Sequence, residues 1–218
     1  MTFIEDTRIL IKNDEIKEAS KNILEDAIQA LLGDPVAYGK IIVALAKSPF
    51  FIREQLFWGK MEMFLSGIYL EKEDREKLNS KLAEYGNKEE NVKRLLSTID
   101  KVETKQKMDY LINATRCLLA GSIDLPKYYR VVQAITQTLE EDLVYLSQHI
   151  EEPEIAECYQ VYGLATSGLM YHSVISGGGA LGNGVQRYSF YDLAKDVDMY
   201  SISYNNINKY PRVNSNKK

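Results

Sequence analysis

The chain has 218 residues, a formal net charge of -4 and a pI near 5.4, with 45% hydrophobic and 27% charged side chains. This composition is typical of a folded globular protein and excludes an intrinsically disordered chain. The slightly acidic balance disfavours binding to nucleic acid or an anionic membrane through the whole surface, because it provides no general attraction to phosphate.

The cysteines and the N-terminal residues bear on the compartment. Cys117 and Cys158 lack the number and spacing of a disulfide scaffold or a cysteine-rich zinc module. Charged residues interrupt the first ten positions, so they do not form the apolar centre of a secretory signal. No stretch reaches the roughly 18 consecutive apolar residues of a membrane span. We therefore expect a cytoplasmic protein without a transmembrane segment.

The first two-thirds of the chain is predicted to be helical. Apolar residues recur at helical intervals over residues 14–31, and Gly33 is expected to end that helix. Asp34-Pro35 supplies a cap and a first-turn proline for a helix over residues 35–47. The pair Ser48-Pro49 predicts a break, because the residue before a proline is biased away from helical geometry.

The helix expected over residues 49–69 has apolar residues in nearly every angular sector. A helix that is apolar all round is either buried on all sides or covered by a partner. We favour a central core helix. In the alternative interpretation the partner-binding residues would be Phe57, Trp58, Met61 and Phe64.

Four more helices are expected to complete the bundle. Turns at Gly86-Asn87 and Gly121-Ser122 separate helices over residues 72–85, 88–100 and 104–120, and a long helix begins at residue 124. Its predicted core stripe is Val132, Ile135, Leu139, Leu143, Leu146 and Ile150. The sequence thus predicts a helical bundle over residues 1–152.

The composition changes after residue 152. A helix is expected over residues 154–166, two strands over residues 171–175 and 187–190 flank a glycine-rich loop, and a helix over residues 192–202 follows. This order is the outline of a winged-helix module. The predicted fold is therefore mainly α, with a winged-helix-like α+β module at residues 153–204 and a flexible tail at residues 205–218.

No catalytic, metal-binding or cofactor-binding residue emerges from the motifs. His149 and His172 have no cysteine or serine nucleophile at motif spacing, so capping or packing is the favoured role of each. The glycines at residues 177–184 do not match a dinucleotide-binding pattern, and a hairpin loop is the better interpretation. The consecutive acids Glu140-Glu141-Asp142 are read as solvated side chains. We accordingly expect no cofactor and no enzymatic activity.

The winged-helix outline raises DNA binding, but the charges argue against it. No lysine or arginine occurs from Val131 to Gln186, so the helix that would enter the major groove has no basic side chain for phosphate or guanine. Under this alternative the contacts would come from Arg187 on the wing and from Lys209 and Arg212 in the tail.

Several segments resemble helical proteins of bacterial mobile elements and prophages. The residues that carry this resemblance are Gly33-Asp34-Pro35-Val36, Ile99-Asp100-Lys101 and Gly121-Ser122-Ile123-Asp124. Leu164 with Gly168-Leu169-Met170, followed by residues 188–194, resembles the winged-helix tail of abortive-infection (Abi-alpha-like) proteins. Tyr191 and Ala194 stand where that family usually has threonine and glycine. The resemblance implies a setting of phage–host conflict and no particular chemistry.

Three functions remain open from the sequence. We favour a non-enzymatic protein-interaction protein, a defence or mobile-element accessory factor that binds a protein partner or itself. The alternative is a DNA-binding transcriptional regulator that uses the C-terminal module. An enzyme of unrecognised type comes third, because no catalytic constellation is visible. A nucleic-acid partner is not expected.

Overall fold

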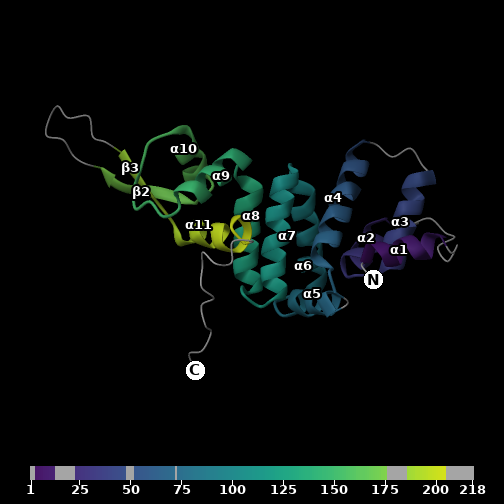
Figure 1. Cartoon of the computed structure of the whole chain (residues 1–218). Helices are drawn as coiled ribbons and strands as arrows, with labels where there is room; N and C mark the ends of the chain where they lie inside the picture. The colour runs from purple at the N-terminus through teal and green to yellow at the C-terminus, as the bar shows by residue number, and fades with distance from the viewer. Residues whose placement is uncertain (1–2, 13–22, 48–51, 72, 176–185, 205–218) are drawn as a thin grey trace, which may run out of the picture. The chain divides into compact units, whose positions relative to one another are not determined.

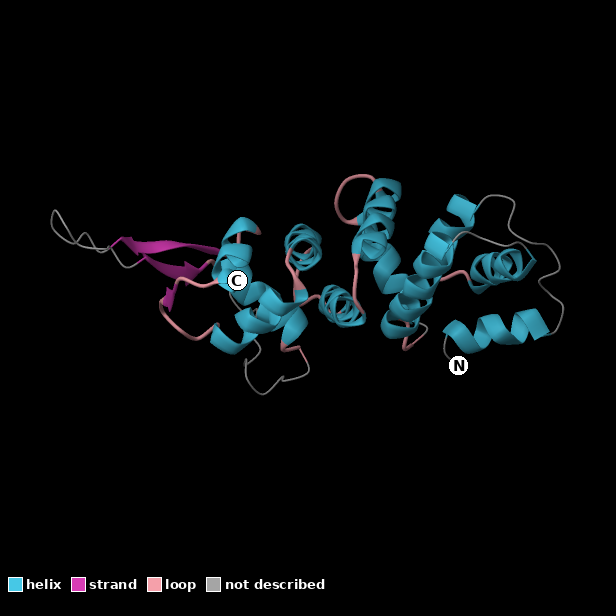
Figure 2. Ribbon diagram, turned by 90° about the horizontal axis from the view of Figure 1, so that it is seen from above, coloured by secondary structure: helices cyan, strands magenta, loops and turns pink. Residues whose placement is uncertain are grey.

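The computed structural model describes residues 3–12, 23–47, 52–71, 73–175 and 186–204. These residues form eleven α-helices, one π-helical turn and three short strands (Figure 1, Figure 2). The first seven helices are α1 (Phe3–Lys12), α2 (Ile23–Leu31), α3 (Pro35–Lys47), α4 (Ile52–Ile68), α5 (Glu73–Ala83), α6 (Lys88–Lys101) and α7 (Lys105–Leu119). The remaining elements are α8 (Leu125–Gln137), α9 (Glu140–His149), β1 (Ile155–Ala156), α10 (Tyr159–Thr166), β2 (Met170–Ile175), β3 (Gln186–Phe190), α11 (Asp192–Val197) and η1 (Asp198–Ile202).

The elements group into two compact units, which we call unit 1 (residues 1–126) and unit 2 (residues 127–218). The division falls within the first turn of α8. It does not coincide with the boundary expected after residue 152, because α9 packs against α10 and η1 of the C-terminal part. The fold is mainly α with a small antiparallel sheet near the C-terminus, as the sequence predicts.

Helix starts and stops in unit 1 follow the predicted signals. Gly33 adopts a φ of 91°, and the amide of Asp34 donates to the Gln29 carbonyl at 3.0 Å, which ends α2. The Asp34 side chain then accepts from the Val36 amide at 2.9 Å and starts α3. Helix α3 has the predicted bounds. The predicted break at residues 48–49 and the predicted helix start at residue 14 lie outside the described residues.

Helix α4 forms the centre of unit 1. It contacts α1 on one side and α6 and α7 on the other (Figure 1). The buried side chains share one face, because they recur at steps of three and four residues. They are Trp58, Met61, Phe64, Leu65 and Ile68, each at most 4% exposed. The opposite side of the helix is exposed at Leu56, Gly59, Glu62 and Ser66.

The prediction of one long helix from residue 124 to residue 150 is wrong. The structure has two helices, α8 and α9, because the chain turns at Leu139, which is extended (φ -61°, ψ 149°) and 61% exposed. Thr138 directs its hydroxyl back to the Ala134 carbonyl at 2.8 Å and closes the last turn of α8. The acids Glu140, Glu141 and Asp142 form the first turn of α9, where the helix dipole favours negative charge.

Unit 2 contains a three-stranded antiparallel sheet in the order β1-β3-β2. Ile155 of β1 pairs with Tyr188 of β3, and Met170 of β2 pairs with Phe190 of β3. Helix α10 contacts β2, α11 contacts β3, and η1 contacts α9. The alternation of helices and strands follows the predicted outline, to which the structure adds β1. The glycine-rich loop at residues 176–185 and the tail at residues 205–218 lie outside the described residues.

Candidate functional site

Helix α10 carries the most exposed large hydrophobic side chain in the described part of the chain. Tyr159 is 91% exposed and Tyr162 is 45% exposed, and Thr166 in the next turn is also exposed. Because steps of three and four residues return to the same side of a helix, these three side chains share one face. We call this surface the tyrosine face: Tyr159, Tyr162 and Thr166.

The buried side of α10 fixes the direction of this face. Val161 and Leu164 are fully buried, and they lie on the opposite side of the helix from Tyr159 and Tyr162. The helix ends at Gly168, whose φ is 76°, and the Leu169 amide donates to the Leu164 carbonyl at 2.8 Å. Two buried aliphatic side chains therefore anchor α10, and its tyrosine side chains point outward.

A close approach between α9 and α10 also holds this helix in place. A Cβ atom at residue 163 would lie 1.9 Å from Asp142 Oδ2, so the observed separation requires Gly163. The Asp142 side chain is buried in this contact. Burial, and secondly the charge of Glu141, raise the pKa of the Asp142 carboxyl above its ordinary value.

Aromatic contacts continue the tyrosine face onto the sheet. The rings of Tyr162 and Tyr188 meet edge-to-face with centroids 6.3 Å apart, and the His172 ring lies 4.2 Å from that of Tyr188. The Tyr188 hydroxyl donates to Gln186 Oε1 at 3.2 Å. Burial, and secondly the charge of Glu157, raise the pKa of Tyr188. Glu157 therefore acts electrostatically on the aromatic group behind the tyrosine face.

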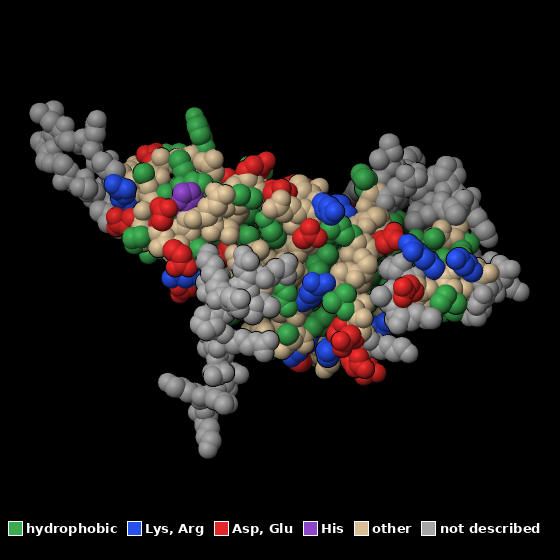
Figure 3. All heavy atoms as spheres, in the orientation of Figure 1, with side chains coloured by type: hydrophobic (Ala, Val, Ile, Leu, Met, Phe, Trp, Pro, Cys, Tyr) green, Lys and Arg blue, Asp and Glu red, His purple; other side chains and the backbone are tan. Residues whose placement is uncertain are grey.

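The surroundings of α10 are acidic. Ten acidic and four basic side chains occur between residues 127 and 204, and none of the basic ones lies between residues 131 and 186. The loop before α10 contributes four exposed glutamates, which are Glu151, Glu152, Glu154 and Glu157. On the side that Figure 3 draws, acidic side chains occur over the part of unit 2 that carries α9 and α10. The tyrosine face is thus bordered by negative charge.

The histidines and cysteines of the chain are engaged in structural contacts. His149 Nδ1 lies 2.6 Å from Glu152 Oε1, and its ring packs on Tyr145 with centroids 4.1 Å apart. Burial and a hydrogen bond with Cys158 raise the pKa of Tyr145 to about 12. Burial raises the pKa of the Cys117 thiol to about 12, which leaves it almost entirely protonated at neutral pH. The described residues contain no group of three or more histidine, cysteine or acidic side chains that could hold a metal ion.

Three of the four partner-binding candidates on α4 belong to the core. Trp58 is 4% exposed and Met61 and Phe64 are fully buried, whereas Phe57 is half-buried with its ring 5.0 Å from that of Trp58. Trp58, Met61 and Phe64 therefore lie in the core of unit 1 and do not form an exposed surface there. Helix α4 is buried on that face and exposed on the opposite one, so it is not the helix buried on all sides that the sequence favours.

The basic candidates for nucleic-acid contact are not brought together among the described residues. Arg187 is exposed on β3, opposite Ala156 of β1. Lys209 and Arg212 lie outside the described residues. The exposed side of α10, which would be the reading helix, carries tyrosines in place of cations.

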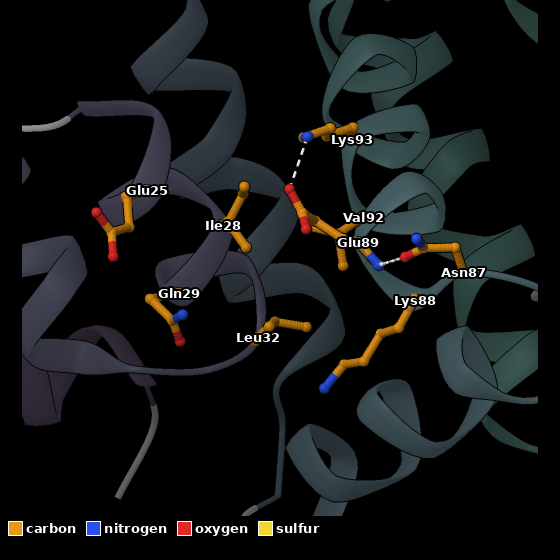
Figure 4. A pocket seen from close by; sticks show the side chains of 9 residues that line it. All are labelled: Glu25, Ile28, Gln29, Leu32, Asn87, Lys88, Glu89, Val92 and Lys93. Atoms are coloured by element: carbon orange, nitrogen blue, oxygen red, sulfur yellow. Dashed lines mark hydrogen bonds and ion pairs between the residues drawn. The ribbon is translucent and has the colours of Figure 1, made fainter.

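A groove in unit 1 is a second candidate surface. It encloses about 660 Å³ between α2 and α6, with the aliphatic side chains Ile28, Leu32 and Val92 among its lining residues (Figure 4). Lys93 Nζ pairs with Glu89 Oε1 at 2.6 Å, and this contact lowers the pKa of Glu89. Asn87 accepts a hydrogen bond from the Glu89 amide. The groove is amphipathic, and its lining residues include no cysteine, serine, threonine or histidine.

Sequence reasoning missed the tyrosine face. The available signal was the pair Tyr159 and Tyr162, three residues apart on a helix whose other apolar residues, Val161 and Leu164, are also three apart. Two such pairs offset by two residues indicate opposite faces. Which pair is buried depends on packing against α9 and the sheet, and periodicity alone does not supply that.

Comparison with models of protein families, with curated proteins and with solved structures finds no match to this chain. Within the described ranges, none of the helices combines the length and the apolar character needed to cross a membrane.

Proposed function

We propose that this chain is a non-enzymatic protein-interaction protein and that the tyrosine face of α10 is its docking surface. The observation that carries the proposal is the exposure of Tyr159 on a helix whose opposite side is buried at Val161 and Leu164. Tyrosine is enriched at protein interfaces because it combines a large contact area with a hydroxyl group and little conformational entropy. Tyr159 and Tyr162 lie on the same face of the helix, and neighbouring exposed aromatic side chains are typical of interaction surfaces.

The alternative, a DNA-binding regulator, is less well supported. The described part of unit 2 has four basic side chains, Lys127, Arg130, Arg187 and Lys195. Two of them already pair with acids, since Lys127 Nζ lies 3.1 Å from Asp196 and Lys195 Nζ lies 3.8 Å from Asp192. Phosphate contacts supply most of the affinity of a DNA-binding protein, and the exposed side of α10 offers none.

The setting of phage–host conflict is part of the proposal only through the sequence resemblance described above. We propose an accessory role in defence or in mobile-element biology on that ground. The physical argument concerns the docking surface and does not depend on this setting.

Site-specific photo-cross-linking in cells tests the docking surface. A benzophenone amino acid replaces Tyr159 in one variant and Tyr85 in another. Tyr85 is the matched control, because it is 48% exposed and lies in unit 1. We expect a discrete protein adduct from position 159 and none from position 85. Equal cross-linking from both positions, or none from position 159, would contradict the proposal.

A gel shift with duplex DNA separates the two functions. At physiological salt we expect weak binding that Tyr159→Ala and Tyr162→Ala leave unchanged. Sequence-specific binding in the range of about 10⁻⁸ M or tighter, abolished by these substitutions, would support the regulator instead.

A further inference from the structure

We infer that the segment bound by the tyrosine face is basic and rich in arginine. This inference rests on the proposed function, because it names the chemistry of the partner for the same surface. Three features of the described residues carry it: the aromatic rings, the border of carboxylates, and the distribution of cations in unit 2.

The rings of the tyrosine face are suited to a guanidinium group. In the described part of the chain Tyr159 makes no hydrogen bond or ring contact, so its ring is available to a ligand. A cation within about 6 Å of an aromatic centroid is attracted by the ring, and arginine stacks on such rings better than lysine does. The chain uses this contact internally, where the Arg75 guanidinium lies 4.9 Å from the Phe3 ring centroid and Lys127 lies 5.7 Å from that of Tyr200.

The carboxylates beside α10 select positive charge. Glu157 precedes Tyr159 by two residues and raises the pKa of Tyr188, which packs against Tyr162. Glu154 and the other glutamates of this loop are exposed. Residues 131–186 contain no lysine or arginine. The basic groups near this loop are His149, 2.6 Å from Glu152, and Arg187, which lies opposite Ala156, so the acids outnumber them. An acidic peptide or a nucleic acid would be repelled here, and a purely apolar helix would leave the carboxylates and tyrosine hydroxyls without partners.

Arginine satisfies both parts of the surface at once. Its planar guanidinium can lie on a tyrosine ring while its N–H groups donate to a neighbouring carboxylate. Lysine can pair with the carboxylates but stacks less well. A preference for arginine over lysine is therefore the specific expectation, and general attraction to a cation is not sufficient.

Fluorescence anisotropy of labelled peptides with the full chain tests the inference. The probes are an Arg-Gly repeat, a Lys-Gly repeat and a Glu-Gly repeat of equal length. We expect the arginine peptide to bind more tightly than the lysine peptide, no binding of the glutamate peptide, and weaker binding as salt is raised. Tyr159→Ala should lower the affinity for the arginine peptide roughly two- to five-fold. Tyr159→Phe should retain most of the affinity, because it retains the ring.

Two further variants separate ring contact from charge. Glu157→Gln should lower the affinity for both basic peptides and reduce the salt dependence of binding. Tyr85→Ala in unit 1 should change neither the affinity nor its salt dependence. Equal affinity for the arginine and lysine peptides with no effect of Tyr159→Ala would overturn the inference, and so would absence of binding. If position 159 still cross-links to a protein in that case, the docking surface stands and only the chemistry of its partner is wrong.

The basic residues of the chain's own tail are the competing occupant. Lys209→Gln combined with Arg212→Gln in the full chain should leave the affinity for the arginine peptide unchanged. A marked increase in affinity would show that the tail occupies the face in cis and would overturn the assignment of an external partner. Circular dichroism of every variant should match the parent, and for Glu157 and Tyr159 this is expected because their side chains are exposed.

Discussion

Two tyrosine hydroxyls are buried in unit 1, one with a hydrogen-bond partner in the described part of the chain and one without. Tyr69 donates its hydroxyl hydrogen to the Leu31 carbonyl, whereas the Tyr38 hydroxyl has no hydrogen-bond partner among the described residues. Both rings pack on Phe3 with centroids 5.6 Å away. Burial raises the pKa of each phenol, so both stay protonated throughout the neutral range.

Removal of each hydroxyl should therefore have opposite consequences. Tyr69→Phe should lower the free energy of unfolding by about 1 kcal/mol, because the buried Leu31 carbonyl loses its donor. Tyr38→Phe should leave stability unchanged or increase it, because an unpaired polar group is removed from the core. Denaturant titrations followed by Trp58 fluorescence measure both. A loss for Tyr38→Phe equal to that for Tyr69→Phe would mean that the Tyr38 hydroxyl has a partner.

In unit 2 the corresponding polar group is the carboxyl of Asp142. Its folded-state pKa is raised, chiefly by burial and secondly by Glu141, above an ordinary value of 3.8. The folded state then binds the proton more tightly than the unfolded state does. The stabilising contribution of this group is full below the unfolded pKa and is lost as the pH rises through the folded pKa.

Asp142→Asn should therefore stabilise unit 2 at pH values above the raised pKa, where the native side chain is a buried carboxylate. The gain over the parent should shrink as the pH falls through the raised folded-state pKa, where the native carboxyl becomes neutral as well, and should be smallest below the ordinary value of 3.8. Hydrogen–deuterium exchange of unit 2 peptides over a pH series measures this difference. Glu141→Gln should also stabilise unit 2, by a smaller amount than Asp142→Asn. A gain for Asp142→Asn that does not vary with pH would refute this account.

At the scale of elements, side chains of neighbouring helices in unit 1 donate hydrogen bonds to the carbonyl groups at helix C-termini. Asn79 of α5 donates to the Leu32 carbonyl after α2, and Asn91 of α6 donates to the Leu82 carbonyl of α5. Lys60 of α4 donates to the Asp100 carbonyl near the end of α6 at 2.7 Å, and Arg116 of α7 donates to the Gly67 carbonyl of α4 at 2.9 Å. These groups satisfy carbonyls that a helix leaves free, and the cations also complement the helix dipole.

Arg116→Met tests one of these contacts while retaining the aliphatic stem. We expect a loss of about 1–2 kcal/mol in unfolding free energy, because the Gly67 carbonyl loses a charged donor at the negative end of α4. Trp58 lies on the same helix and reports the transition. Lys105→Met on α7 removes an exposed charge and should change stability by less than about 0.5 kcal/mol. Equal losses for the two variants would argue against a specific capping role.

Local signals predicted most helices, and the failures have a common cause. Gly33, Pro35 and Gly121 punctuate the chain where the structure turns, since their backbone conformations are intrinsic to the residue. The break between α8 and α9 was not predicted, because Leu139 lies in register with the apolar stripe although its side chain is exposed. Strand β1 has two residues and forms only by pairing with β3, which follows it by about 30 residues. Elements created by distant contacts leave little trace in local periodicity.

The same reasoning applies to the candidate site. The lack of cations on α10 can be read directly from the sequence. Exposure of Tyr159 and burial of Trp58 are results of tertiary packing, so an aromatic residue on a helix is compatible with either outcome beforehand. Composition thus indicated which partners α10 disfavours, and packing was needed to locate the surface.

At the scale of the whole molecule, the chain consists of two compact units. Trp58 is the only tryptophan of the sequence and is 4% exposed within unit 1, so its fluorescence should be blue-shifted and poorly quenched by iodide. Because Trp58 packs inside unit 1, its denaturation curve follows that unit, whereas hydrogen exchange of separate peptides follows each unit in turn.

We expect the two units to respond separately to substitutions in their cores. Gly163→Ala should destabilise unit 2 by about 1–3 kcal/mol, because the new Cβ would collide with Asp142 and force α9 and α10 apart. It should increase exchange in unit 2 peptides and leave the Trp58 midpoint unchanged, while Arg116→Met should lower that midpoint and leave exchange in unit 2 unchanged. If each variant shifts both readouts by the same free energy, the whole chain unfolds as one cooperative unit and the independence expected here is wrong.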